Sequence, residues 1–116
     1  MEIAPRFAPL LAQFDFALDR LVTRLAGFGD EEYFWEPVPG CWSIRRRGQQ
    51  RTTGIRGAGA WVLERAIPGP DPAPFTTIAW RLGHLGGTMC LRADHTIGTK
   101  SLTHDRYEYP STAADA

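Results

Sequence analysis

Two stretches of the chain place apolar residues at helical spacing, and the first begins at Phe7. From there, large apolar residues recur every three or four positions, which lays one stripe along a helix: Leu10, Leu11, Phe14, Leu18, Leu21, Val22 and Leu25. Gly27 and Gly29 indicate where this helix ends. The spacing predicts a helix near residues 7 to 26.

The second stretch follows a possible helix cap at Thr76 or Thr77. One face is then continued by Ile78, Leu82, Leu85 and Met89 as far as Gly98. The pattern predicts a second long helix near residues 77 to 97.

The segments outside these helices give weaker signals. Asp30, Glu31 and Glu32 favour the first turn of a short helix, because negative charge is stabilised at a helix start. Residues 43 to 64 lose the helical period and predict a loose hairpin or a flexible loop. The prolines of residues 68 to 74 indicate a stiff, extended connection, and residues 111 to 116 read as the start of a further helix.

Two sequence blocks, Trp35-Glu36-Pro37-Val38-Pro39-Gly40-Cys41-Trp42-Ser43 and Thr77-Ile78-Ala79-Trp80-Arg81-Leu82-Gly83-His84-Leu85, resemble the DinB/YfiT-like superfamily. The resemblance implies a four-helix bundle, in which many members bind a divalent metal through three histidines and some act as thiol-dependent transferases or isomerases. We therefore expect a mainly α protein: a partial DinB-like four-helix bundle with an irregular or hairpin insertion between the two long helices. Residues 1 to 116 would form a single DinB-like domain, truncated at its carboxyl-terminal end.

The resemblance makes His84 a candidate metal ligand, because His84 matches the family's histidine on the second long helix. The His-x-x-x-His pair that normally supplies the other ligands is absent from the sequence. His95 would lie about 16 Å further along the same helix, at roughly 1.5 Å per residue, which is too far to share an ion. His104, Asp15, Asp19 or a second chain remain as ways to complete a site. The resemblance makes a divalent metal a possible cofactor, and the sequence specifies neither the metal nor a thiol cofactor.

Composition narrows the possible partners. Thirteen basic residues balance thirteen acidic ones, so no overall field attracts nucleic acid or an anionic membrane. The first residues lack a secretory signal and no apolar run is long enough to span a membrane, so we expect a cytoplasmic protein. Cys41 and Cys90 form no paired motif and are interpreted as small core residues.

Two clusters of residue types have competing interpretations. The arginines of residues 45 to 56 could neutralise phosphates, but a solvated loop is favoured and no aromatic residue lies among them to stack on bases, which argues against nucleic acid. The aromatic cluster Tyr33, Phe34, Trp35 and Trp42 could line a pocket, and core packing is favoured.

Two hypotheses of function follow. The first is a DinB-like protein of a metal-dependent thiol transferase family that lacks the usual full set of ligands. The second is a non-enzymatic helical interaction module that self-associates, either as a homo-oligomer or with a partner that completes the bundle. The sequence specifies no reaction and no substrate.

Overall fold

The two long helices lie where the periodicity predicts them. The structure is a computed structural model that describes residues 2–116, so only Met1 of the predicted domain lies outside the described residues. A 3-10 turn η1 (Pro5–Phe7) leads into α1 (Ala8–Arg24), and α3 spans Ile78–Ile97. The Thr77 hydroxyl accepts a hydrogen bond from the Trp80 backbone N–H at 3.2 Å, which confirms Thr77 as the cap of α3.

A three-stranded antiparallel sheet occupies the segment predicted as a loose hairpin or loop. It consists of β1 (Ile44–Arg46), β2 (Gly54–Arg56) and β3 (Trp61–Arg65), in the order β1-β3-β2. The prediction of a mainly α, partial four-helix bundle is therefore wrong, and the fold is mixed α and β. Strands of three residues are too short to display an alternating pattern, so the sequence did not reveal them.

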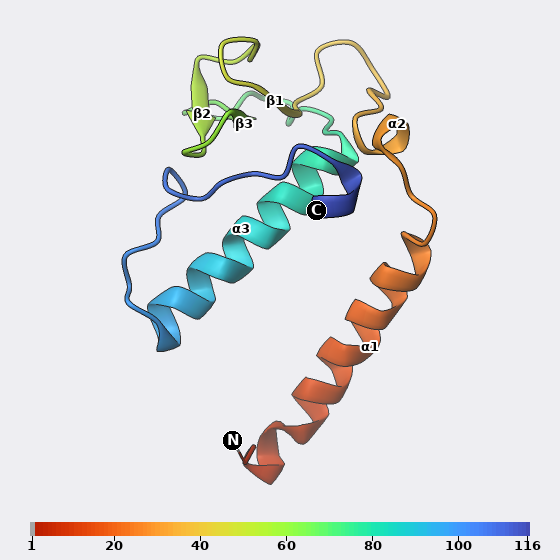
Figure 1. Cartoon of the computed structure of the whole chain (residues 1–116), viewed down its shortest axis with the longest axis vertical. Helices are drawn as coiled ribbons and strands as arrows, with labels where there is room; N and C mark the ends of the chain where they lie inside the picture. Colours follow the sequence, from red (N-terminus) through yellow and green to blue (C-terminus); the bar gives the residue numbers. More distant parts are fainter. Residues whose placement is uncertain (1) are drawn as a thin grey trace.

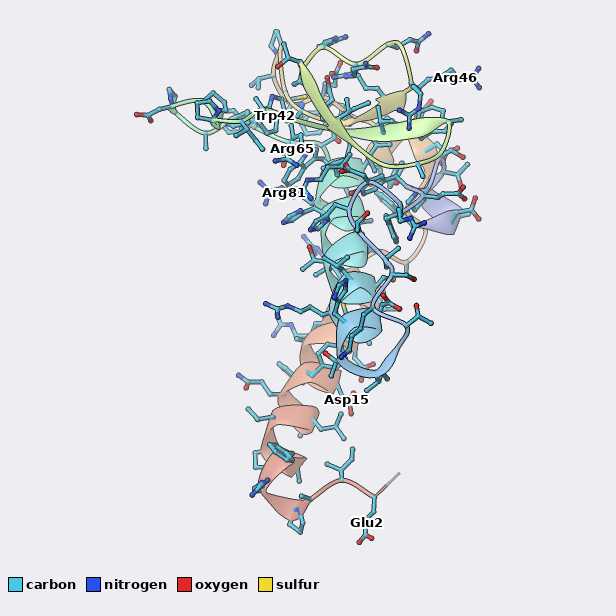
Figure 2. The ribbon with its side chains drawn as sticks, turned by 90° about the vertical axis from the view of Figure 1, so that its left-hand side faces the viewer. Glu2, Asp15, Trp42, Arg46, Arg65 and Arg81 are labelled. Carbon is cyan, nitrogen blue, oxygen red and sulfur yellow. The ribbon has the colours of Figure 1, made fainter. Side chains whose placement is uncertain are left out.

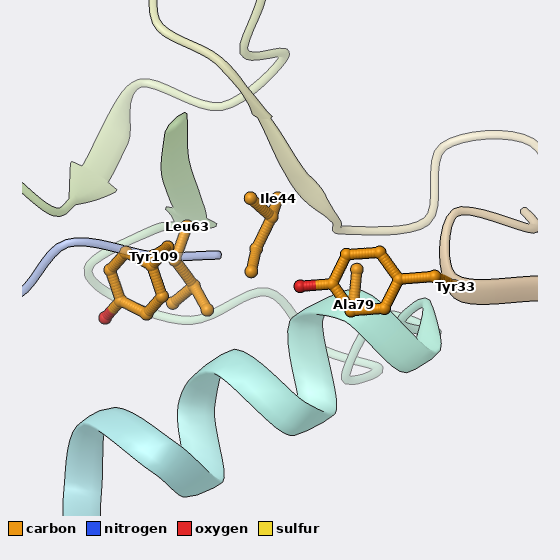
Figure 3. Close-up of a cluster of buried hydrophobic side chains, with 5 residues drawn as sticks. All are labelled: Tyr33, Ile44, Leu63, Ala79 and Tyr109. Carbon is orange, nitrogen blue, oxygen red and sulfur yellow. The ribbon is translucent and has the colours of Figure 1, made fainter. Parts of the chain in front are cut away.

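The hydrophobic core is small and lies between the sheet and the first turns of α3. It consists of Tyr33, Ile44, Leu63, Ala79 and Tyr109 (Figure 3). Ile44 and Leu63 are register partners in β1 and β3, so both side chains project from the same face of the sheet. Tyr33 ends the short helix α2 (Asp30–Tyr33), and the carboxyl-terminal segment carries Tyr109 back along α3.

Helix α1 stands apart from this core. Figure 1 shows α1 extending away from the sheet and lying apart from α3. Within residues 2–116, none of the α1 side chains is buried. The fold of the remaining elements therefore does not depend on contacts with the α1 apolar stripe.

Three further expectations need correction. Cys41 is buried as predicted, but Cys90 is exposed because it lies on α3 beyond the sheet. Trp35 is 65% exposed and does not join the core that Tyr33 enters. The final residues form a single 3-10 turn, η2 (Ala113–Asp115), rather than the start of an α-helix.

Over residues 2–116, α1 and α3 both fall short of the combined length and apolar character that a membrane-spanning helix needs.

Candidate functional site

His84, the residue that the resemblance singles out, lies on the exposed surface of α3 against Trp80. The two rings stack with centroids 4.9 Å apart and planes inclined by 22°. Together with Trp42, Thr76 and Arg81, they line an open cavity of about 390 Å³. The residues that line this cavity are thus mainly aromatic, small or basic, and no carboxylate is among them.

The other candidate ligands do not assemble around His84. Asp15 and Asp19 lie on α1, which Figure 1 shows apart from α3, and His95 Nε2 lies 2.8 Å from the Leu102 carbonyl oxygen. Across residues 2–116, no group of three or more histidine, cysteine, aspartate or glutamate side chains is placed to hold an ion. The expectation of a metal-binding protein is therefore wrong for the described residues, whereas ligation of a metal by His84 itself stays a prediction.

His104 lies near enough to His84 for their charges to interact, but most of the charged groups around His104 are basic. Burial lowers the pKa of His104, and the positive charges of Arg56 and His84 lower it further. Two histidines alone do not supply the three protein ligands that a catalytic zinc-type site needs.

The arginine-rich segment is tied into the fold through two carboxylates. Arg45 donates from Nε to Glu64 and from Nη2 to Glu36, each at 2.6 Å. Arg51 Nη1 donates to the same Glu36 oxygen at 3.2 Å. The favoured interpretation of a solvated loop is therefore incomplete, because Arg45 and Arg51 also form ion pairs that hold the segment against the rest of the fold.

Glu64 is the buried centre of this network. Its side chain is only 1% exposed, and its carboxylate also accepts from the backbone N–H of Ser43 at 3.0 Å and of Arg51 at 2.6 Å. These donors compensate the lost hydration of a buried charge. Sequence reasoning missed Glu64, because a single carboxylate after Trp61-Val62-Leu63 carries no sign of partners far away in the chain.

Glu36 holds the exposed side of the network. The hydrogen bond from Arg45 lowers the pKa of Glu36, and the charges of Arg45 and Arg51 act in the same direction against a partial desolvation. Glu36 therefore stays ionised and keeps both guanidinium groups in place.

Several large exposed apolar side chains lie on the side of α1 that the sequence pattern predicts to be apolar. We call it the α1 stripe, and it comprises Phe7, Leu10, Leu11, Phe14, Leu18 and Val22. These side chains are 42% to 63% exposed. A second exposed apolar surface lies on α3 at Leu85 and Met89, which are 44% and 43% exposed. A continuous apolar surface of this kind marks an interaction site more often than an unused face.

Comparison of the chain with protein-family models, with curated proteins and with solved structures found no match. The resemblance to the DinB/YfiT-like superfamily thus rests on residues 35 to 43 and 77 to 85 alone and stays a prediction.

Proposed function

We propose that this chain is a non-enzymatic interaction module that self-associates through the α1 stripe. The main observation behind the proposal is that α1 is a 17-residue amphipathic helix and that none of its apolar side chains is buried. An isolated helix of this length is marginal in water, because most helix stability in proteins comes from packing an apolar face. A second copy of the chain would supply that packing.

The extent of the surface supports a stable pair. If each of the six side chains of the α1 stripe buries on the order of 100 Å², the stripe alone contributes roughly 600 Å² per copy, most of the ~800 Å² per partner of a typical specific interface. The exposed surface at Leu85 and Met89 on α3 can supply the remainder. Each copy carries both surfaces, so α1 of one copy and α3 of the other can cover each other reciprocally.

Charges beside the two apolar surfaces complement each other. Asp15 and Asp19 lie one turn before Leu18 and Val22 along α1, at the edge of the α1 stripe. On α3, Arg81 and Arg92 lie one turn from Leu85 and Met89. Pairing α1 with α3 of a second copy therefore brings acidic and basic edges together, which favours this pairing in a defined orientation.

The alternative of a metal-dependent transferase finds less support. It requires three ligands around one ion, and residues 2–116 offer no such group. Self-association needs only the surfaces described above.

The test is the oligomeric state of the purified chain, measured by light scattering coupled to size-exclusion chromatography across a range of concentrations. The wild-type chain should elute at twice the mass of one chain, and the double variant Phe14→Asp with Leu18→Asp should be monomeric. Phe16→Asp is the matched control, because Phe16 is 63% exposed on the opposite side of α1. A wild-type monomer at high micromolar concentration, or equal disruption by Phe16→Asp, would contradict the proposal.

A further inference from the structure

A separate cavity lies beside β1, and neither His84 nor any residue of the α1 stripe lines it. Its volume is about 360 Å³, within the range of small-molecule sites. It is lined by Phe34, Ser43, Trp61 and the polar residues Glu36, Arg45, Arg46, Gln49 and Arg51, with Ile44. Figure 2 shows Arg46 at the outer side of the sheet, away from α1.

One wall of this cavity is aromatic. The rings of Phe34 and Trp61 stack with centroids 5.5 Å apart and planes inclined by 30°. Neither residue lies within the arginine-rich segment, so the fold supplies the flat apolar surface that the segment itself lacks. The faces that the two rings turn toward each other are occupied by this contact, so a planar ligand can pack only against the remaining ring surface that lines the cavity.

Among the charged side chains that line this cavity, one arginine has no carboxylate partner. Arg45 pairs with Glu36 and Glu64, and Arg51 pairs with Glu36, so two carboxylates balance two guanidinium groups. Arg46 is exposed and forms no salt bridge with any carboxylate of residues 2–116. Its guanidinium carbon lies over the Trp61 ring, 5.9 Å from the ring centroid. A planar guanidinium held there can donate two parallel hydrogen bonds to a carboxylate.

We infer that this cavity binds a small aromatic monocarboxylate, with its ring packed against the aromatic lining formed by Phe34 and Trp61 and its carboxylate on Arg46. The uncompensated charge of one favours a monoanion over a phosphate monoester, which carries about −1.5 to −2 at neutral pH. Arg51 and Gln49 supply further donors at the rim, and Glu36 excludes ligands with a second negative charge.

The inference is tested by isothermal titration calorimetry on the full chain with 1-naphthoate as the probe. The neutral 1-naphthamide keeps the ring system and removes the charge, and inorganic phosphate keeps a charge without the ring. We expect one 1-naphthoate per chain, with both other probes binding at least about tenfold more weakly, since a charge-assisted hydrogen bond and the stacking contact are each lost in one of them.

Variants separate the roles of charge and fold. Arg46→Gln should weaken 1-naphthoate binding by about tenfold or more while leaving 1-naphthamide unaffected. It should not disturb folding, because Arg46 is exposed. Arg20→Gln, an exposed arginine on α1, is the matched control and should bind like the wild type.

Three results would overturn the inference. They are the absence of 1-naphthoate binding at low millimolar concentration, equal affinity for 1-naphthoate and 1-naphthamide, and an unchanged affinity in Arg46→Gln. Tighter binding of a short oligodeoxythymidine than of 1-naphthoate would also overturn it, and would point instead to recognition of a phosphate backbone.

Discussion

The Tyr33 hydroxyl donates a hydrogen bond to the Pro110 carbonyl at 3.1 Å, across 77 residues of sequence. Tyr33 is fully buried at the end of α2, and its ring contacts Phe28 and Phe34 edge-to-face. The Asp30 carboxylate reinforces the same connection, because it accepts from the Ala113 backbone N–H at 2.7 Å. These two hydrogen bonds fasten the carboxyl-terminal segment to α2 and so close the core over α3.

Removal of the Tyr33 hydroxyl should loosen this connection without opening a cavity. We expect Tyr33→Phe to lower the free energy of unfolding by about 0.5–1.5 kcal/mol, the usual net value of one such hydrogen bond, with an extra cost from the unpaired Pro110 carbonyl. Urea denaturation followed by circular dichroism measures it. A variant as stable as the wild type would contradict a contribution of this hydrogen bond to stability.

Alkaline pH should destabilise the fold through the tyrosines. Burial raises the pKa of Tyr33 from 10.0 to about 12, and burial also raises the pKa values of Tyr107 and Tyr109. The neutral phenols are therefore favoured in the folded state. Their contribution to stability is fully present below about pH 10, and the contribution of Tyr33 is lost as the pH rises through about 12.

Ultraviolet titration of tyrosinate absorbance checks this prediction. The chain has three tyrosines, and all three have raised pKa values, so the folded protein should show no phenol that titrates at the ordinary pKa of 10.0. The control is the same titration in denaturant, where all three should return to the ordinary value. A folded-state transition centred at pH 10 would contradict the described burial.

The helices could be predicted from the sequence, whereas the sheet could not. Helical periodicity is local, so α1 and α3 could be predicted to within one or two residues. The strands depend on pairing between distant segments: Arg45 lies opposite Val62, and Ile55 lies opposite Glu64. Nothing within three residues of β1 or β2 specifies those partners.

The candidate sites also differ in whether they depend on local sequence or on contacts between distant segments. The α1 stripe is a property of one helix and could be predicted, whereas the cavity beside β1 combines Phe34 from the end of α2 with Trp61 from β3. Considered alone, the arginine-rich segment lacked aromatic neighbours, and only the fold provides them. The resemblance directed attention to His84, but a metal site also requires the positions of other ligands, which a single matched residue cannot specify.

The close approach of α3 to the core depends on Gly83. A methyl group at this position would lie 2.6 Å from Ile44 Cδ1 and 3.0 Å from Tyr109 Cδ1. We expect Gly83→Ala to lower the free energy of unfolding by about 1–3 kcal/mol through overpacking, less any gain in helix propensity. Gly86→Ala on the same helix meets only the Tyr107 hydroxyl, at 3.2 Å. It should be neutral or stabilising, and equal effects of the two substitutions would contradict the described packing.

Replacing Glu64 should cost more than any other substitution discussed above, because its carboxylate compensates Arg45 and two backbone donors where water cannot reach. Glu64→Gln keeps the volume but removes the charge, so the Arg45 guanidinium, whose side chain is 15% exposed, loses half of its pairing. We expect a loss of about 3–5 kcal/mol in the free energy of unfolding, the typical cost of breaking a buried ion pair from one side. Glu108→Gln, at an exposed carboxylate, should change stability by less than about 0.5 kcal/mol. Thermal and urea denaturation of both variants provide the measurement, and a Glu64→Gln variant that is as stable as Glu108→Gln would rule out the buried network as a source of stability for the sheet.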